Sequence, residues 1–448
     1  MRNDFFSTVG EILKYGGSTF AALIAASLYT ATDSFFVGNW VGTDGLGAMA
    51  LVFPVTMILT GLGTLVEIGG SAVVSEKIGA GKKILAEKIM RANYVYAFII
   101  GIVFAIVGNI VVEPLLYALA DNHDEYAIID MAVGFLRITL CGVPFLLTGY
   151  LTETFMRCIE QPTHVFYLVG LTSLTNIILD ALFVITFGWG MAGAAVATVI
   201  AQILGAVISL WYFRYSRQKF VSSWGVAGME YLFLEFKIGV GFAIADFMMF
   251  FIEYFLNGVL LAHDASHLLA AAALSNIILS FVYLPLNGLD TGIQPLVSKL
   301  FAANKEHQCL SVMRYGFVLT MILTFAMYAA LMFFTQDVAR TFIADNEPVT
   351  PEMITFMRCT FLLQPFVGVY TWLSGIMAAF EDEWRNLLVS FLPLVVQVPL
   401  IWFLPHVMPM EYIALNFSAL DVAEAALAFV LIRPFLRSKK LSLKKIFA

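Results

Sequence analysis

The fold is decided by one stretch in the first half of the chain, Ser173-Leu174-Thr175-Asn176-Ile177-Ile178-Leu179-Asp180-Ala181-Leu182-Phe183. It lies inside a run from about Val165 to Phe187 that carries no other charge. A run of that length and apolarity is typical of a membrane-spanning helix. Asn176 and Asp180 are four residues apart, so they share one helix face. An aspartate at mid-bilayer costs about 2.5 to 3.5 kcal/mol on insertion scales, so this face borders protein or a watery cavity.

The composition places the rest of the chain in a membrane as well. Of the 448 residues, 60% are hydrophobic and 13% are charged, whereas soluble proteins contain about 25% charged residues. Twelve apolar runs predict twelve transmembrane helices and an all-α polytopic membrane protein. The runs lie at about 16–39, 46–76, 92–120, 127–157, 165–187, 190–213, 233–262, 267–299, 311–335, 351–380, 386–405 and 411–433.

Positive charge predicts the orientation in the membrane. Lys and Arg gather in the segments at 77–91 and 214–237 and in the tail at 433–445, while the alternate loops are nearly bare. With both termini in the cytoplasm, all but three of the 25 Lys and Arg residues fall on the cytoplasmic side. The three exceptions are Arg137, Arg340 and Arg358.

The chain also contains a weak tandem repeat. Phe135-Leu-Arg137-Ile-Thr139 matches Phe356-Met-Arg358-Cys-Thr360, and Pro144-Phe145 matches Pro365-Phe366 at the same spacing. Six helices in each half, both halves starting inside, make these parallel repeats with a substrate site expected between them. We therefore expect an N-terminal six-helix bundle at 1–214, a cytoplasmic linker at 215–236 and a C-terminal bundle with a basic tail at 237–448.

Charged residues inside the spans are few, and acids dominate, which suits cationic ligands. Two arginines, Arg137 and Arg358, can each neutralise an acid of their own half. Glu235, Asp421 and Glu424 either take part in function or simply lie near a membrane interface. The remaining acids are Asp33, Glu67, Glu153, Asp180, Asp246, Glu253 and Asp290.

Asp33 lies at the end of a polar stripe in the first run, where Ser27, Thr30 and Ser34 recur at helical spacing. A buried pair of carboxylates is a candidate for proton exchange. Carboxylate, amide and hydroxyl oxygens equally suit a hard cation such as sodium. The residues alone do not choose between the two ions, and the Asn176 and Asp180 pair can also be a purely structural contact between helices.

Several classes of protein are disfavoured by missing motifs. No GxxxxGK[ST] loop is present, which argues against ATP-driven transport, and no HExxH or GxSxG occurs. The four cysteines form no CxxC pair and predict neither a disulfide framework nor a zinc site. Gly79-Ala-Gly81 is interpreted as a helix stop. Prolines within the spans predict bends, at Pro54, Pro144, Pro365, Pro393 and Pro399.

At this point the chain resembles the multidrug and toxic compound extrusion (MATE) family over nearly its whole length. The resemblance is carried by Ser27-Leu-Tyr-Thr-Ala-Thr-Asp33-Ser-Phe-Phe-Val-Gly38, by Gly61-Leu-Gly63 with Val74-Ser75 and Gly79-Ala-Gly81-Lys82, and by Gln294-Pro295-Leu-Val-Ser298. Its most specific part is Asn176-Ile-Ile-Leu-Asp180 followed by Gly190-Met-Ala-Gly193-Ala-Ala-Val-Ala-Thr198, which is similar to the MepA-like and DinF-like bacterial branches.

The resemblance implies two six-helix bundles that form a V around a central cavity. It implies export of drugs and organic cations in exchange for Na+ or H+, with no enzymatic activity, no cofactor and no nucleic-acid partner. The family's ion site maps to Asp33, Asn176, Asp180 and Thr198, which would also ligate Na+ if sodium is the coupling ion. We expect a monomer in the plasma (inner) membrane that contributes to antibiotic resistance.

Two departures from the family pattern concern acids. Glu153 stands where the family usually has asparagine, four residues before Arg157, and Glu160 stands where it usually has glycine. We therefore add Glu153 to the predicted cation-coupling residues. The predicted substrate-cavity residues are Glu67, Glu253, Asp290 and Asp246.

Three rival functions were weighed. A lipid-linked saccharide flippase has the broader superfamily fold, but such proteins tend towards basic cavities. A major-facilitator carrier also has twelve helices, but its Gly-x-x-x-Asp-Arg loop after the second helix is missing here. A membrane enzyme acting on lipid would need a clustered polar catalytic set near the interface, and the sequence has none.

Overall fold

The computed structural model describes residues 8–10, 12, 31–119, 126–159, 162–215, 228–302, 305–344, 348–379, 385, 388–389, 391–438 and 445–446. Within these residues the chain is helical, with turns and no strand, and helix is present in the described part of all twelve predicted runs. The prediction of an all-α polytopic membrane protein is confirmed. Ser27, Thr30 and Glu160 lie outside the described residues.

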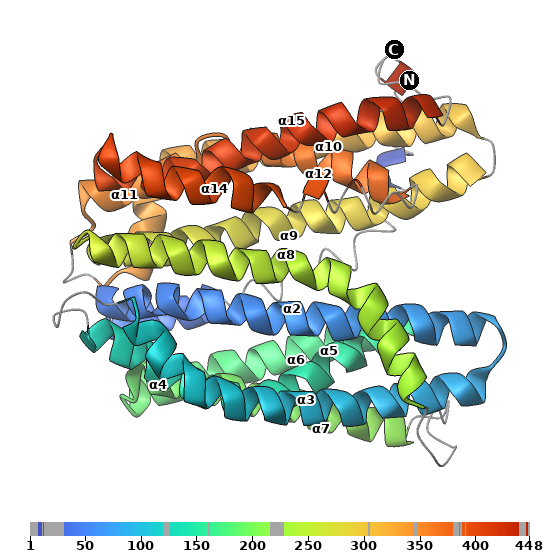
Figure 1. Ribbon diagram of the computed structural model, residues 1–448, viewed down its shortest axis with the longest axis horizontal. Coiled ribbons are helices and arrows are strands. Elements are labelled where there is room, and N and C mark those ends of the chain that lie inside the picture. The colour runs from blue at the N-terminus through green and yellow to red at the C-terminus, as the bar shows by residue number, and fades with distance from the viewer. Residues whose placement is uncertain are drawn as a thin grey trace. The chain divides into compact units, whose positions relative to one another are not determined.

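The first part of the chain forms long helices (Figure 1). Residues 31–40 are helical and are followed by α2 (Thr43–Gly79), α3 (Lys83–Tyr117), α4 (Tyr126–Cys141), α5 (Val143–Cys158), α6 (Pro162–Asp180), the π-helix η2 (Ala181–Thr186) and α7 (Gly190–Tyr215).

The second part begins with α8 (Met229–Ala262), a few residues before the predicted start of that run. It continues with α9 (His267–Ala302), α10 (Glu306–Phe342), α11 (Pro351–Phe361), α12 (Pro365–Ala379), α14 (Leu392–Phe403), the 3-10 helices η3 (Leu404–His406) and η4 (Met410–Ala414), and α15 (Leu415–Ser438).

Length and apolarity mark many of these helices as membrane spans. Among the described residues, 8 helices are long and apolar enough to cross a membrane, or 9 if a bent pair counts as one span. The bent pair is Tyr126–Cys141 with Val143–Met156, at an angle of 56°. Apolar side chains on the outer faces, such as Ile110 (69% exposed) and Ile106 (58% exposed) of α3, are suited to contact lipid.

Of the prolines predicted to bend or interrupt the spans, two that the repeat relates lie at a break between helices. The first lies between α4 and α5, just before Pro144, and the second between α11 and α12, just before Pro365. Proline lacks an N–H and disfavours helical geometry in the residue before it, so a helix ends there. The helix is not broken at Pro54, which lies inside α2, or at Pro399, inside α14. Neighbouring helices re-satisfy a carbonyl freed by proline in a span.

The chain forms two compact units, which we name after one acid in each. The Asp33 unit comprises Leu28–Ala273 and Phe342–Glu347, and the Asp290 unit comprises Met1–Ser27, Leu274–Thr341 and Pro348–Ala448. In this division α8 belongs to the Asp33 unit and the boundary falls within α9. The predicted bundles with a linker at 215–236 stay a prediction, since residues 216–227 lie outside the described part.

In the Asp33 unit, α8 packs along α2 through small residues (Figure 1). A Cβ added at Gly69 of α2 would lie 2.3 Å from the carbonyl oxygen of Glu235 on α8. A Cβ added at Gly239 of α8 would lie 2.2 Å from the carbonyl oxygen of Leu65 on α2. Glycine therefore allows the two backbones to approach closely, as is common between membrane helices.

In the Asp290 unit, one hydrophobic core joins α9, α10, α12 and α15. Its fully buried members include Met313, Ile376 and Ile432, and Trp372 donates its indole N–H to the Met313 carbonyl at 3.0 Å. Both ends of the chain contribute to the same core, through Ile12 and Ile446, each 0% exposed.

Candidate functional site

Three of the predicted cation-coupling residues meet inside the Asp33 unit. Asp33 comes from the helix at 31–40, whereas Asn176 and Asp180 lie one turn apart on α6. Oriented to donate, the Asn176 amide nitrogen lies 3.1 Å from Asp33 Oδ1 and 3.1 Å from Asp180 Oδ2. The exposed fraction is 6% for Asp33 and 0% for the other two. The amide therefore bridges two buried carboxylates.

Thr198 of α7 completes the group of four. Its hydroxyl and the Asp180 carboxyl both lie near enough to the Asp33 carboxylate to act on it. Asp180 Oδ1 and Thr198 Oγ1 are buried, and within the described part of the chain neither makes a hydrogen bond. Buried oxygens are almost always satisfied, so two such atoms side by side indicate room for a proton, a water or a cation.

The local sequence explains why Asp180 faces inward. It is the last residue of α6 and directly precedes the π-helix Ala181–Thr186, a form that is rare and often found at functional sites. The turn into α7 uses Gly188 (φ 66°) and Gly190 (φ 55°), where residues with a side chain would be strained. Phe183 and Trp189 stack across this turn at 5.0 Å, which fixes the end of α6 against α7.

The chemistry of this group follows from its two carboxylates. Two carboxylates in direct contact repel each other unless a proton or a cation lies between them. The oxygens present come from carboxylate, hydroxyl and amide groups, which are the ligands of hard cations such as Na+. Among the described residues, no group of three or more His, Cys, Asp or Glu could hold a metal ion. The four residues therefore fit a proton or a hard monovalent cation.

Glu153, the fifth predicted coupling residue, belongs to the same unit and lies near two other acids. Glu67 of α2, Glu153 of α5 and Asp246 of α8 all act electrostatically on Tyr150. Thr64 Oγ1 donates to Asp246 Oδ2 at 2.9 Å. Two predicted substrate-cavity residues, Glu67 and Asp246, are thus brought together with Glu153 around an aromatic ring.

The other two predicted cavity residues lie one in each unit. Asp290 belongs to the Asp290 unit, where it accepts a 2.7 Å hydrogen bond from Gln294. A Cβ added at Gly375 of α12 would lie 1.6 Å from Asp290 Oδ1, so the carboxylate fills the space that this glycine leaves. Glu253 is 1% exposed on α8 in the Asp33 unit.

Four other charged residues of the predicted spans can also be located in the structure. Arg137 donates to Glu113 of its own half, which confirms the neutralising role considered for it. Glu235 is 4% exposed and accepts a 2.9 Å hydrogen bond from Asn93 of α3. Asp421 and Glu424 are 5% and 8% exposed, and both lie near enough to Tyr283 to influence it electrostatically. All three acids of uncertain role are therefore buried.

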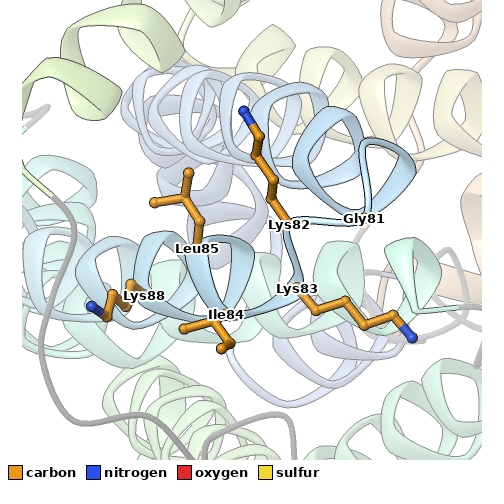
Figure 2. A pocket seen from close by; sticks show the side chains of 6 residues that line it. All are labelled: Gly81, Lys82, Lys83, Ile84, Leu85 and Lys88. Atoms are coloured by element: carbon orange, nitrogen blue, oxygen red, sulfur yellow. The ribbon is translucent and has the colours of Figure 1, made fainter.

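A hollow of about 530 Å³ lies at the turn from α2 to α3, outside both clusters. It is lined by Gly81, Lys82, Lys83, Ile84, Leu85 and Lys88. Figure 2 shows that the lysine side chains point in different directions. They therefore form no converging set of ligands. Gly81 has a φ of 74°, and α2 ends at Gly79, so the predicted helix stop is confirmed.

Sequence reasoning missed three polar neighbours of these clusters. Thr64 and Tyr150 each lie three residues before a predicted acid, Glu67 and Glu153 respectively, and so share its helix face. Gln202 lies four residues after Thr198 on α7, and its buried Oε1 makes no hydrogen bond within the described residues. The sequence could have indicated all three, because each lies about one helix turn from a residue that was already predicted.

The helices and the buried oxygen cluster define a polytopic membrane protein with an internal polar site suited to a cation. A family model, MatE, matches residues 19–182 and 238–403. The chain belongs to the MatE family, whose members are transporters rather than enzymes. The two matched segments lie on either side of the predicted linker, in keeping with a tandem repeat.

Individual relatives extend this comparison. The chain is 23% identical over 390 residues to a Bacillus subtilis protein named "Probable multidrug resistance protein YoeA", covering 84% of this chain and 82% of the relative. It is 24% identical over 381 residues to "Multidrug export protein MepA" of Staphylococcus saprophyticus, covering 84% and 82%. A solved structure of a multidrug resistance MATE family transporter in an inward-facing conformation matches with a TM-score of 0.85, 18% identity, and coverage of 92% and 95%.

Proposed function

We propose that the chain is a secondary active multidrug efflux antiporter of the plasma membrane with both termini in the cytoplasm. It exports organic, mostly cationic compounds in exchange for Na+ or H+. The observation that carries the proposal is the pair of buried carboxylates, Asp33 and Asp180, bridged by the Asn176 amide. The names of the YoeA and MepA relatives support multidrug export as the overall task.

The coupling step follows from the electrostatics of the pair. An ion or proton that enters between Asp33 and Asp180 removes their repulsion, and its release restores that repulsion. A bound cation therefore stabilises the conformation in which the two acids lie close together. A ligand shifts a conformational equilibrium only by its differential affinity for the two states. Two carboxylates in direct contact make the difference in cation affinity between the two states large.

The choice of cationic drugs rests on the second cluster. Glu67, Glu153 and Asp246 all lie near enough to Tyr150 to act on it electrostatically, and each of the four side chains is only partly buried. Organic cations are attracted both to carboxylates and to the face of an aromatic ring. A tyrosine ring with acids around it therefore favours a cationic substrate over an anionic one.

Coupling is proposed to be asymmetric, with the ion bound in the Asp33 unit. The tandem repeat aligns Asn176 of the first half with Gln397 of the second half, and Asp180 with Ile401. Gln397 Nε2 donates to Asn416 Oδ1 at 2.8 Å, and both residues are 0% exposed. The second half thus has a neutral amide pair where the first half has an amide and a carboxylate. Without a charge there, this position offers a coupling cation little attraction.

The available energy sets a limit on a single site. One imported charge at 100 mV supplies about 2.3 kcal/mol, which supports roughly a 40- to 50-fold gradient of a neutral substrate. Exchange of a monovalent cationic drug for one proton or sodium ion moves no net charge. The concentration gradient of that ion, or a second ion, must then drive export.

The test is transport by the purified full-length chain in proteoliposomes under separately imposed Na+ and H+ gradients. The expected result is uptake of a cationic dye that is driven by one of the two gradients and is absent in Asp180→Asn. Dye movement that neither gradient accelerates would contradict antiport. Movement of a lipid-linked saccharide without dye transport would favour a flippase instead.

A further inference from the structure

A buried amide oxygen next to the coupling site has no role in the function argued so far. Gln202 Oε1 is shielded from solvent and makes no hydrogen bond within the described residues. The same holds for Thr198 Oγ1 and Asp180 Oδ1. Buried polar atoms are almost always satisfied, so unsatisfied oxygens on successive turns of α7 and on the neighbouring Asp180 point to a missing partner.

Gln202 is in line with the coupling site along α7. It lies four residues after Thr198, so the two side chains share a helix face and are separated by about 6 Å along the axis. In the predicted topology α7 runs from the outer loop at Gly190 towards the cytoplasmic end at Tyr215. Gln202 is therefore one turn closer to the cytoplasm than Thr198.

The side chain of Gln202 faces the break in the bent span. Gly142 is the single residue between α4 and α5, the pair that is bent by 56°. A Cβ added at Gly142 would lie 2.2 Å from Gln202 Oε1, so an alanine there would displace this oxygen. Broken helices in transporters form ion and substrate sites, and irregular backbone within a membrane is found where it borders protein or a cavity.

We propose that Gln202 supplies the next oxygen on the path of the coupling cation, on the cytoplasmic side of the Asp33 site. The ligand is a monovalent cation bound through oxygen, either Na+ or a hydronium ion. An amide oxygen carries no charge, so it holds the cation weakly and passes it on, whereas Asp33 and Asp180 bind it. The inference rests on the proposed function, and Gln202 has the role of a relay within it.

The test begins with Gln202→Leu in the full-length protein reconstituted in proteoliposomes. Leucine has a similar volume but no oxygen. Ion-driven dye transport is expected to fall at least tenfold, whereas equilibrium dye binding, and its dependence on Na+ concentration and pH, stay within threefold of the parent. Gln202→Glu, which keeps an oxygen, is expected to retain at least half of the parent rate. Parent-level transport by Gln202→Leu would overturn the proposal.

A second variant probes the same oxygen without changing Gln202. Gly142→Ala places a methyl group where Oε1 lies, and it is expected to slow ion-driven transport as Gln202→Leu does. The matched control is Gly134→Ala on α4, the helix that ends just before Gly142, where a Cβ would meet nothing within 4 Å. If Gly142→Ala accumulates like this control and transports like the parent, the oxygen is not on the path.

The double variant Gly142→Ala with Gln202→Leu separates a shared oxygen from two packing defects. Two changes that act through one atom give a loss no larger than either alone, whereas independent defects add. An additive loss would therefore contradict the relay. If Asp180→Asn keeps ion-driven transport, the proposed function itself fails. If Asp180→Asn is inactive while Gln202→Leu is normal, only the relay fails.

Discussion

The carboxylates of Asp33 and Asp180 lie on either side of a single amide, that of Asn176, at 3.1 Å each. The two acids come from helices far apart in the chain, while Asn176 and Asp180 are one turn apart. An amide nitrogen has two N–H groups and can serve both acids at once. Asn176 thus holds the acids close without neutralising either of them, and the first predictions concern this geometry.

Asp180→Asn is expected to abolish ion-driven efflux while leaving the protein folded. The substitution keeps the shape and removes the charge that attracts the coupling cation. Efflux of a cationic dye and the elution profile in detergent are measured together, with Asp44→Asn at the exposed start of α2 as the control. Efflux at the parent rate by a well-expressed Asp180→Asn protein would refute this role.

Asp33→Asn is expected to remove ion-driven efflux, whereas Asp290→Asn and Glu253→Gln mainly change the apparent affinity for substrate. The reason is that the repeat position in the second half holds the neutral Gln397 and Asn416 pair. Gradient-driven efflux is compared at matched expression. The site would lie in the other half if Asp290→Asn lost coupling and Asp33→Asn kept it.

Glu153→Asn is expected to keep coupled transport, and its pH or sodium dependence can shift. Glu153, Glu67 and Asp246 all lie near enough to Tyr150 to act on it electrostatically. Apparent affinity for a divalent cationic dye is expected to fall by about threefold to tenfold, and that for a neutral dye to stay unchanged, because one carboxylate of three is lost. An inactive but normally expressed Glu153→Asn protein would make Glu153 a primary coupling residue.

Gly239→Ala is expected to destabilise the Asp33 unit. The new methyl group would lie 2.2 Å from the Leu65 carbonyl oxygen, so α2 and α8 must move apart. Overpacking of this kind costs about 1 to 3 kcal/mol, which a thermal unfolding scan in detergent would detect as a lower Tm. Gly170→Ala on α6 is the control, since its Cβ would meet nothing within 4 Å. Equal Tm values for the two variants would contradict the close approach.

Cysteines placed at positions 43 and 122 are expected to react with a membrane-impermeant reagent in whole cells. The distribution of Lys and Arg places both positions outside, position 43 at the start of α2 and position 122 in the predicted loop at 121–125. The background needs Cys141 replaced first, because it is the exposed one among the four native cysteines. Labelling that requires permeabilised cells would reverse the orientation.

Much of the fold could be predicted from the sequence because its signals are local. Apolar length located helix in all twelve runs, and Pro144 and Pro365 located the breaks that divide two of them. Pro54 gave the same signal without a break, because tertiary packing can repair a helix around proline. Rules based on local sequence therefore identified the membrane spans, but they did not identify which prolines interrupt the helices.

The candidate site was predicted in part, for a related reason. Charged residues in a membrane are costly, so Asp33 and Asp180 were conspicuous, and Asn176 followed from its spacing. Gln202 carries no charge, and its importance depends on a contact with Gly142 that no spacing predicts. The nearness of Glu153 to Glu67 and Asp246 was not predicted, since it arises only when α2, α5 and α8 pack together, and its part in coupling stays a prediction.

The burial of both chain ends in one core has a practical consequence for tags and truncations. Ile12 and Ile446 are each fully buried in the core of the Asp290 unit. Arg314 donates to the Ile446 carbonyl at 2.8 Å, and Lys445 pairs with Glu306 at 2.9 Å. Clipping the tail would therefore remove packing as well as positive charge. Reporter fusions intended to map topology belong in a loop, where they leave this core whole.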